Sequence, residues 1–373
     1  MKHINNIIII GTNHHNTLSM VRCFGEEDLN VKLYIYGDNR SYIASSNYVD
    51  EVSYFDSAED AVAAIPSDPL NKPLVIACSD EISSLMDLKF DDFVQRCYFF
   101  NASEKGKITT LMDKQNQLEL AKECGFLVPD SIEIFPNLID LPVLHYPCLV
   151  KPKESIHGGK NIYICRNVEE LKEALNKFNH DYKVLIQDYI KKDYEIVVLG
   201  VSIEEQIIIP GYIQKHRDDK GGTTYSTVHP IANLDNKVVE SCFRLLKKTR
   251  YQGLWGIECI KQDENFFFLE LNLRNDATTY ALKVAGVNLP LLYLRLMENP
   301  QARINMKSIR TIDSMVEFND FNFVLKRKVG LFQWIRELKN SECKYFYSKD
   351  DPKPFKHMQR KYMRFLMNRM LHK

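Results

Sequence analysis

The sequence predicts a mixed fold, in which an α/β unit with a parallel sheet comes first and α+β units follow. Over residues 1–105, short apolar runs alternate with helix-like segments, which is typical of β–α–β units. Further along, an expected helix at 235–250 leads into two apolar strands at 254–260 and 266–271. The short polar turn between these strands indicates a hairpin, so the later part of the chain is not built on a parallel sheet alone.

Five apolar runs are the expected strands of the first unit: Ile7–Ile10, Val31–Tyr36, Val52–Phe55, Leu74–Cys78 and Tyr98–Phe100. Gly11 follows the first run directly and opens the turn Gly-Thr-Asn-His-His-Asn. This turn lacks the G-x-G-x-x-G spacing that cradles the phosphates of a dinucleotide. We therefore expect no dinucleotide site in the first unit.

The middle of the chain alternates short strands, helices and irregular connections. A helix is expected at 113–124, because Gly125 and Pro129 follow it as stop signals. Prolines make the segment 136–147 an irregular connection. The other elements expected before residue 210 are a strand at 148–151, a loop at 152–159, a strand at 161–165, a helix at 168–178 and strands at 183–188, 194–201 and 203–209.

Composition and charge restrict the possible classes of protein. Hydrophobic residues make up 45% and charged residues 26%, which is typical of globular proteins. The 49 basic and 49 acidic residues leave no net charge to attract nucleic acid over a distance. No apolar stretch approaches the roughly 20 residues of a membrane span, and no signal peptide is evident, so a cytoplasmic protein is expected. The nine cysteines lack Cys-x-x-Cys spacing, which argues against disulfides and structural zinc.

Three oxygen-bearing side chains form a candidate metal site in the expected hairpin. Glu258 lies on the first strand, and Glu270 and Asn272 lie two residues apart on the second. Residues two apart on a strand share a face, so the three side chains can converge there. Carboxylate and amide oxygens are ligands that suit Mg²⁺. The alternative is a solvated strand face, but that does not explain the Asn or the Arg274 that follows.

Two lysines upstream are candidates for binding phosphate. Lys151 ends an apolar strand, where a buried ammonium is costly unless an anion meets it, although the side chain could also leave the strand end into water. Lys114 begins the helix at 113–124. Gly158 and Gly159 lie in the following loop, where backbone N–H groups can approach a phosphate closely. The strand end at 187–190 can offer backbone groups to a nucleobase, but taken alone it is only a strand end.

The order of these motifs resembles the ATP-grasp superfamily over roughly residues 1–300. The matching motifs are Asp-Lys at 113–114, Cys-Leu-Val-Lys-Pro at 148–152, the Gly-Gly loop, Gln-Asp-Tyr-Ile at 187–190, Glu195, Gly-Ile-Glu at 256–258 and Leu-Glu-Leu-Asn-Leu-Arg at 269–274. Within the superfamily, the chain is most similar to carboxylate-amine ligases with a carbamoyl-phosphate-synthase-type grasp, including D-aspartate ligases, and less similar to D-alanine–D-alanine ligase. Asp-Pro-Lys-Pro-Phe at 351–355 is a weaker match to the tails of such ligases.

The resemblance implies ATP and Mg²⁺ as cofactors, with two ions and Mn²⁺ as a substitute metal, and it implies a role for each matching residue. Lys114 and Lys151 would bind ATP phosphates under the 158–159 loop, and Arg274 and Lys151 would act in catalysis. Gln187 and Ile190 would contact adenine, and either Asp188 or Glu195 would lie near the ribose. Glu258, Glu270 and Asn272 would hold the metal, and Lys215, Arg217 and Arg274 would face the substrates.

The sequence departs from the family pattern at three points. Gln187 replaces the usual acidic residue, which matters little if the contact is made by the backbone. Leu273 replaces the usual proline and could change the turn that aims Arg274. The phosphate loop has fewer glycines than many relatives. For Arg217, a carboxylate clamp and a hydrated charged loop at 215–220 are equally consistent with the sequence.

These expectations combine into an ATP-dependent ligase that joins a small-molecule carboxylate to an amine through an acyl phosphate. A non-catalytic ATP sensor of the same fold is the alternative. The expected units are a parallel-sheet domain at 1–105, a small lobe with the phosphate loop at 106–190, a large lobe with the metal site at 191–310 and a C-terminal extension at 311–373. The extension ends in a basic amphipathic helix, which is more often packed on its own chain than bound to a membrane surface. The sequence does not indicate an oligomeric state.

Overall fold

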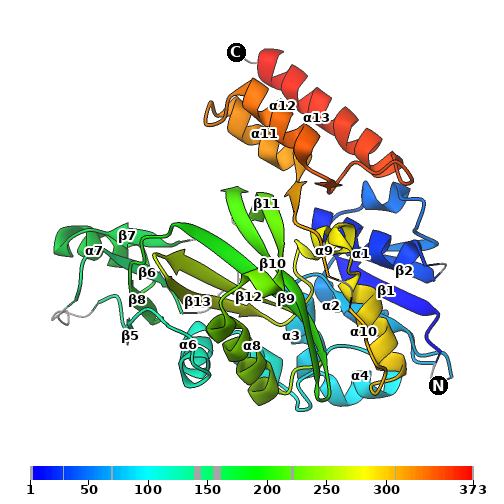
Figure 1. The fold of residues 1–373 in the computed structure, drawn as a ribbon, viewed down its shortest axis with the longest axis horizontal. Coiled ribbons are helices and arrows are strands. Elements are labelled where there is room, and N and C mark those ends of the chain that lie inside the picture. The colour runs from blue at the N-terminus through cyan, green and yellow to red at the C-terminus, as the bar shows by residue number, and fades with distance from the viewer. Residues whose placement is uncertain are drawn as a thin grey trace.

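The computed structural model describes residues 3–27, 29–68, 70–137, 144–153, 161–219, 222–306 and 308–371. Its strands form three sheets, with four strands in the order β3-β2-β1-β4, seven in the order β13-β12-β9-β10-β11-β14-β15 and four in the order β5-β8-β6-β7. Figure 1 shows the first sheet in blue, the seven-stranded sheet at the centre and the small sheet at the opposite end. The mixed α/β and α+β fold class predicted from the sequence is confirmed.

The N-terminal sheet is parallel, as predicted. Its strands are β1 (Asn6–Gly11), β2 (Asn30–Tyr36), β3 (Glu51–Phe55) and β4 (Leu74–Ala77). The connecting helices are α1 (His15–Gly25), η1 (Ile43–Ser45), α2 (Ala58–Ala63), α3 (Asp80–Leu88), α4 (Phe90–Arg96) and α5 (Lys107–Leu111). The fifth strand expected at 98–100 is wrong, because Tyr98 forms only an isolated bridge with Leu74.

The strand order reverses at β1, since β2 and β3 lie on one side of it and β4 lies on the other. In open parallel sheets, ligands bind in the crevice beyond the carboxyl ends of the strands at such a reversal. The loops after β1 and β4 therefore flank a natural binding position.

The small sheet consists of β5 (Ser131–Ile134), β6 (Cys148–Pro152), β7 (Tyr163–Cys165) and β8 (Val184–Asp188), all paired antiparallel. Helix α7 (Val168–Leu175) packs on it and closes a separate apolar core. Strand β5 was not expected, because its four residues carry no strong apolar pattern. Helix α6 (Lys114–Glu123) precedes this sheet, and its N-cap Asp113 accepts hydrogen bonds from the backbone of Gln115 and Asn116.

The central sheet is buried on both faces. Along β9 (Tyr194–Ile203), Ile196 and Val198 pack into one core, whereas Val197 and Leu199 pack into the other. This explains the nearly continuous apolar run of β9, because a strand covered on both faces has no solvent side. Helix α8 (Asn236–Thr249) covers one face, and the expected hairpin is present as β12 (Gly253–Gln262) and β13 (Asn265–Asn272).

The segment from 206 to 230 differs from the expected fold. Instead of a short strand and a charged loop, β10 (Gln206–Asp219) and β11 (Gly222–Pro230) form a long antiparallel pair, followed by η2 (Ile231–Asn233). Their outer halves are rich in Lys, His, Asp and Thr, so the apolar pattern of a strand is missing there. Backbone pairing and contacts with the C-terminal helices stabilise these halves.

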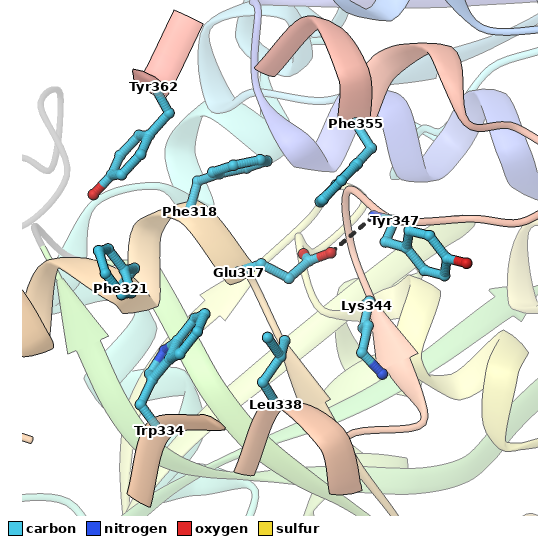
Figure 2. Close-up of a pocket in the computed structure, with 9 residues that line it drawn as sticks. All are labelled: Glu317, Phe318, Phe321, Trp334, Leu338, Lys344, Tyr347, Phe355 and Tyr362. Atoms are coloured by element: carbon cyan, nitrogen blue, oxygen red, sulfur yellow. Dashed lines mark hydrogen bonds between the residues drawn. The ribbon is translucent and has the colours of Figure 1, made fainter. Parts of the chain in front are cut away.

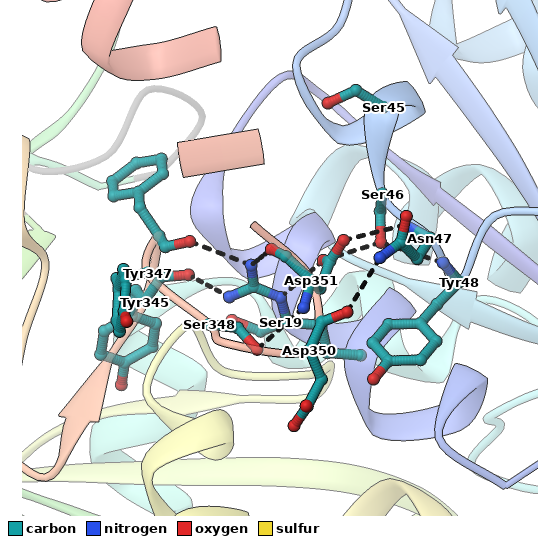
Figure 3. Close-up of polar contacts among 12 residues, drawn as sticks. Ser19, Ser45, Ser46, Asn47, Tyr48, Tyr345, Tyr347, Ser348, Asp350 and Asp351 are labelled. Carbon is teal, nitrogen blue, oxygen red and sulfur yellow. Dashed lines mark hydrogen bonds and ion pairs between the residues drawn. The ribbon is translucent and has the colours of Figure 1, made fainter. Parts of the chain in front are cut away.

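The C-terminal part continues with α9 (Thr279–Ala285), α10 (Leu289–Glu298), β14 (Ile312–Met315), α11 (Glu317–Leu325), α12 (Leu331–Asn340), β15 (Cys343–Lys344) and α13 (Lys353–Leu371). A buried ion pair ties the start of α13 to the N-terminal unit. Arg22 donates to Asp351 at 2.9 Å, and neither side chain is exposed. Asp351 also accepts hydrogen bonds from Ser46 and from the backbone of Asn47 (Figure 3).

Helices α11 and α13 pack through aromatic rings. Phe318 contacts both Phe355 and Tyr362, and the Tyr362 hydroxyl donates to Asn322. These rings line a cavity of 410 Å³ that also includes Trp334 of α12 (Figure 2). One face of the C-terminal helix therefore packs on its own chain, as the sequence favoured. Among the described residues, no helix combines the length and apolarity needed to cross a bilayer.

Candidate active site

The β12–β13 hairpin brings the three predicted metal-binding side chains together. In its register, Glu258 lies directly opposite Glu270, and Gly256 lies opposite Asn272. Residues directly opposite in an antiparallel pair project from the same face, so the two carboxylates are neighbours. Asn272 joins them, since its Nδ2 donates to Glu258 Oε1 at 3.3 Å.

The electrostatics of the pair favour a bound cation. Burial and the neighbouring Glu258 raise the pKa of Glu270 above its usual range. Two adjacent carboxylates repel each other, and either a proton or a metal ion relieves this repulsion. The described residues contain no cluster of three His, Cys, Asp or Glu side chains arranged to hold a metal. Glu258, Glu270 and Asn272 instead offer two carboxylates and one amide. This set fits an ion such as Mg²⁺, which takes the rest of its oxygen shell from phosphate and water.

Lys215 contacts Glu258 of the acidic pair and Glu195 on β9. Its Nζ donates to Glu258 Oε2 at 2.6 Å and to Glu195 Oε2 at 3.4 Å. Burial works to lower the pKa of Lys215, but the two carboxylates outweigh burial and raise it. Lys215 was predicted to face the substrate, and together with Glu258 it lines a central cavity of 540 Å³.

Arg217 is held by protein carboxylates. Its guanidinium donates to Asp320 at 2.9 and 2.8 Å and to Glu337 at 2.7 Å. Asp320 is fully buried and also accepts from Thr224 at 2.7 Å. The structure therefore gives Arg217 two carboxylate partners from α11 and α12, in place of the hydrated loop considered from the sequence. Its predicted contact with a substrate stays a prediction.

Arg274 connects Asn272, one of the candidate metal ligands, to the N-terminal unit. Its Nε and one terminal nitrogen donate to Asp80 at 2.7 and 3.1 Å. The same terminal nitrogen donates to Asn272 Oδ1 at 3.1 Å. Leu273, which replaces the usual proline, is buried and leaves Arg274 beside Asn272. Asp80 begins α3, directly after β4, so the strand reversal of the parallel sheet and the hairpin meet here.

Lys151 is buried at the small sheet. Only 7% of Lys151 is exposed, and its Nζ donates to Gln187 Oε1 at 2.9 Å. Burial and the nearby charge of Lys114 lower the pKa of Lys151 to about 8. The alternative that this lysine leaves the strand end into water is therefore wrong. Gln187 Nε2 is buried and has no hydrogen-bond partner within the described part of the chain.

The remaining predicted residues are distributed between the two lobes. Asp188 Oδ2 lies 3.9 Å from His145, and Ile190 is half-buried just beyond β8. Glu195 on β9 accepts from Lys192 at 2.6 Å, in addition to its contact with Lys215. Burial works to raise the pKa of Glu195, but Lys215 and Lys192 outweigh it and lower the pKa. Gly158 and Gly159 lie outside the described residues.

A cavity of 540 Å³ lies where the hairpin meets the N-terminal unit. Glu258, Lys215 and Arg274 line one side of it. Lining residues that were not predicted include His14, Asn16 and Asp80 near the ends of β1 and β4, Asp276 after β13, and Asn319 and Asn322 of α11. The reversal of strand order at β1 was the signal that could have found the first three.

His14 adds a neutral donor to this cavity. Its Nδ1 accepts the backbone N–H of Asn16 at 3.2 Å, which leaves the ring proton on Nε2. Burial, followed by the charge of Arg274, lowers the pKa of His14 to about 4. At neutral pH, His14 therefore presents an uncharged imidazole.

Comparison with known proteins agrees with this geometry. Residues 120–287 match the family described as the ATP-grasp domain. The chain is 30% identical over 189 residues to the carbamoyl phosphate synthase large chain of Lachnoclostridium phytofermentans, a match to 47% of this chain and 17% of that protein. It is 26% identical over 186 residues to the D-alanine–D-alanine ligase of Petrotoga mobilis, a match to 45% of this chain and 61% of that protein.

The fold is also similar to the crystal structure of N5-carboxyaminoimidazole synthetase from Staphylococcus aureus complexed with ADP. The TM-score is 0.68 at 15% identity, and the similarity covers 88% of this chain and 86% of that chain. The chain spans only 14% to 21% of four carbamoyl phosphate synthase large chains that it matches. The ATP-grasp domain predicted from the ordered motifs is confirmed over residues 120–287.

Proposed function

We propose that this chain, which carries an ATP-grasp domain at residues 120–287, is an ATP- and Mg²⁺-dependent ligase that joins a carboxylate to an amine. The observation that carries the proposal is the pair Glu258 and Glu270, which face each other across one hairpin with Asn272 beside them. The matched D-alanine–D-alanine ligase supports the reaction class. The small-molecule substrates themselves belong to this proposal.

In this proposal, ATP lies between the small sheet and the hairpin. Lys151 and Lys114 neutralise its phosphates. Burial and Lys114 lower the pKa of Lys151, and a phosphate beside the amine would stabilise its charge. Gln187, Asp188, Ile190 and Glu195 would contact the nucleoside, with Gln187 Nε2 as a free donor. Bound Mg²⁺ would neutralise charge on the phosphates, and Glu258, Glu270 and Asn272 would hold it.

The reaction has two steps in this proposal. A substrate carboxylate oxygen attacks the γ-phosphorus of ATP, so that the bond to ADP breaks and an acyl phosphate forms. The amine nitrogen then attacks the acyl carbon, loses its proton and expels inorganic phosphate, which leaves an amide. Such chemistry depends on positioning and charge neutralisation, so a nucleophilic side chain is not required.

The central cavity is the proposed place for the acceptor substrates. Lys215 and Arg274 line it beside Glu258, and they would stabilise charge on the acyl phosphate. The neutral His14 would donate Nε2–H to a substrate oxygen without adding a charge. Arg217 would act there only if it released Asp320 and Glu337.

A substrate screen tests this function. The protein is incubated with ATP, Mg²⁺ and pools of amino acids, and ADP release and product masses are measured. We expect ADP release that depends on a particular pool, together with a product whose mass equals the two substrates minus water. ATP binding without pool-dependent ADP would instead favour the non-catalytic sensor.

The metal site has its own test. Glu270→Gln should lower turnover by roughly 100-fold or more, because one of two metal carboxylates is lost. Glu264→Gln is the matched control, since Glu264 lies fully exposed in the turn of the same hairpin. Wild-type turnover in Glu270→Gln would refute the metal assignment.

A further inference from the structure

A second cavity, of 920 Å³, lies between α13 and the loops that follow β1 and β2. The N-terminal wall includes Asn13 after β1 and the segment 38–40 after β2. In Figure 1, the start of α13 lies beside the N-terminal unit. The buried pair of Arg22 and Asp351 anchors α13 there. The two walls of this cleft are therefore fixed relative to each other.

Six cationic side chains line the cleft: Arg40, Lys353, Lys356, Arg360, Lys361 and Arg364. None of the six forms an ion pair with a described residue. Asp38 is the one carboxylate among the described lining residues, and it accepts hydrogen bonds from Asn13 at 3.2 Å and from the backbone of Arg40 at 3.1 Å. The cleft therefore concentrates unpaired positive charge in a chain with equal numbers of acidic and basic residues.

The spacing of these cations along α13 is unfavourable for the helix itself. Lys356, Arg360 and Arg364 follow one another at intervals of four residues, so they lie above one another on a single face. Like charges at this spacing destabilise a helix. An anion bound in the cleft would compensate this cost. By contrast, the buried guanidiniums of Arg22 and Arg217 are paired with carboxylates.

We propose that this cleft binds a soluble organic ligand that carries two or more phosphate groups. The Arg guanidinium matches phosphate oxygens in pairs, and the Lys ammonium supplies a compact charge. A single phosphate or carboxylate would neutralise only a small part of six cations. Phe365, which is 50% exposed and lines the same cleft, offers an apolar face to the organic part of the ligand. The cations line a recess whose opposite wall is formed by the N-terminal loops, which suits a small ligand better than the flat surface of a membrane.

The cleft adjoins the proposed reaction site. Asn13 lines the basic cleft, and the next residue, His14, lines the central cavity. This step rests on the proposed function: because the two cavities are adjacent, the phosphorylated ligand is one of the two ligase substrates, and its reacting group lies in the central cavity.

Inorganic tripolyphosphate is a suitable probe, and calorimetry of the full chain measures its binding. The measurement is made in the background Lys114→Gln/Lys151→Gln, so that the proposed ATP site does not contribute. In this background, we compare Arg360→Gln/Lys361→Gln/Arg364→Gln with a control, Lys122→Gln/Lys172→Gln/Lys237→Gln, which removes the same charge from exposed positions on α6, α7 and α8. A circular dichroism melt checks that each variant is folded, and Arg364→Gln alone replaces the triple variant if that one is not.

We expect the background protein and the control to bind tripolyphosphate, and the α13 variant to bind at least about 10-fold more weakly. Equal binding by the α13 variant, or no binding by the background protein, overturns the proposal. Sedimentation with vesicles of phosphatidylcholine and phosphatidylglycerol is measured in parallel. Vesicle binding that requires the α13 cations, without tripolyphosphate binding, also overturns it in favour of a membrane surface. These readouts do not depend on ligation, so they stand even if the proposed ligase activity fails its own test.

Discussion

Nucleotide binding should be coupled to proton uptake through Lys151. Burial and Lys114 lower the pKa of this lysine to about 8, so at pH 9 roughly nine tenths of it is neutral in the nucleotide-free protein. A triphosphate beside the amine favours the charged form and raises its pKa again. Binding at pH 9 should therefore take up about 0.9 proton, and ATP affinity should fall about 10-fold between pH 7 and pH 9.

Calorimetry measures this uptake directly. ATP is titrated at pH 9 in two buffers with different ionisation enthalpies, and the difference in heat gives the number of protons. Lys151→Arg keeps its charge at this pH, so its uptake should vanish, whereas the surface control Lys172→Arg should behave as wild type. Binding without proton uptake in the wild type, or the same uptake in Lys151→Arg, would refute the reasoning.

The lowered pKa of Lys151 also determines how the stability of the nucleotide-free protein changes with pH. Between about pH 8 and 10.5, the unfolded lysine still holds a proton that the folded one has lost. The free energy of unfolding of the nucleotide-free protein should therefore rise with pH across this window. Urea titrations of the wild type and of Lys151→Met, in which the rise should be absent, measure it.

Three further changes address the site and its supports. Asp351→Ala leaves its arginine partner buried without a counter-charge and should cost about 3–5 kcal/mol in urea unfolding, whereas the exposed Asp350→Ala should cost little. Arg217→Ala leaves the fully buried carboxylate of Asp320 without its ion-pair partner and should lower the free energy of unfolding. A loss of less than about 1 kcal/mol, which is typical of a surface ion pair, would contradict a stabilising role for Arg217. Glu270→Gln removes repulsion between the carboxylates of Glu258 and Glu270, so the thermal midpoint without metal should rise. The increase in thermal midpoint that Mg²⁺ and ATP produce in the wild type should disappear, and an unchanged increase would argue against the metal role.

Local patterns were sufficient to predict the parallel sheet and the β12–β13 hairpin. In both, the strands are apolar runs bounded by polar turns, and only the pairing of β1 with β4 joins strands that are far apart in sequence. Strand periodicity predicted that Glu270 and Asn272 share one face, and the expected hairpin brought Glu258 beside them. Short or polar strands such as β5 and β11 gave no comparable pattern.

Contacts between distant segments could not be predicted in this way. Arg217 meets Asp320 only because α11 packs against the β10–β11 pair, and no local feature of residues 215–220 indicates that partner. Arg274 meets Asp80 for a similar reason, across the junction between two sheets. Both partners are carboxylates on helices, which the sequence alone cannot distinguish from ordinary solvated positions.

The register of the β12–β13 hairpin makes its turn a spacer of fixed length. Gln262 pairs with Asn265, so only Asp263 and Glu264 connect the strands, and Asp263 takes a positive φ of 51°. A slip of one residue would turn Glu270 and Asn272 to the opposite face of the sheet. Single-residue insertions or deletions in this exposed turn should therefore be far less tolerated than its exposure suggests. In a screen of turn-length variants, we expect loss of ligand binding while the protein still folds.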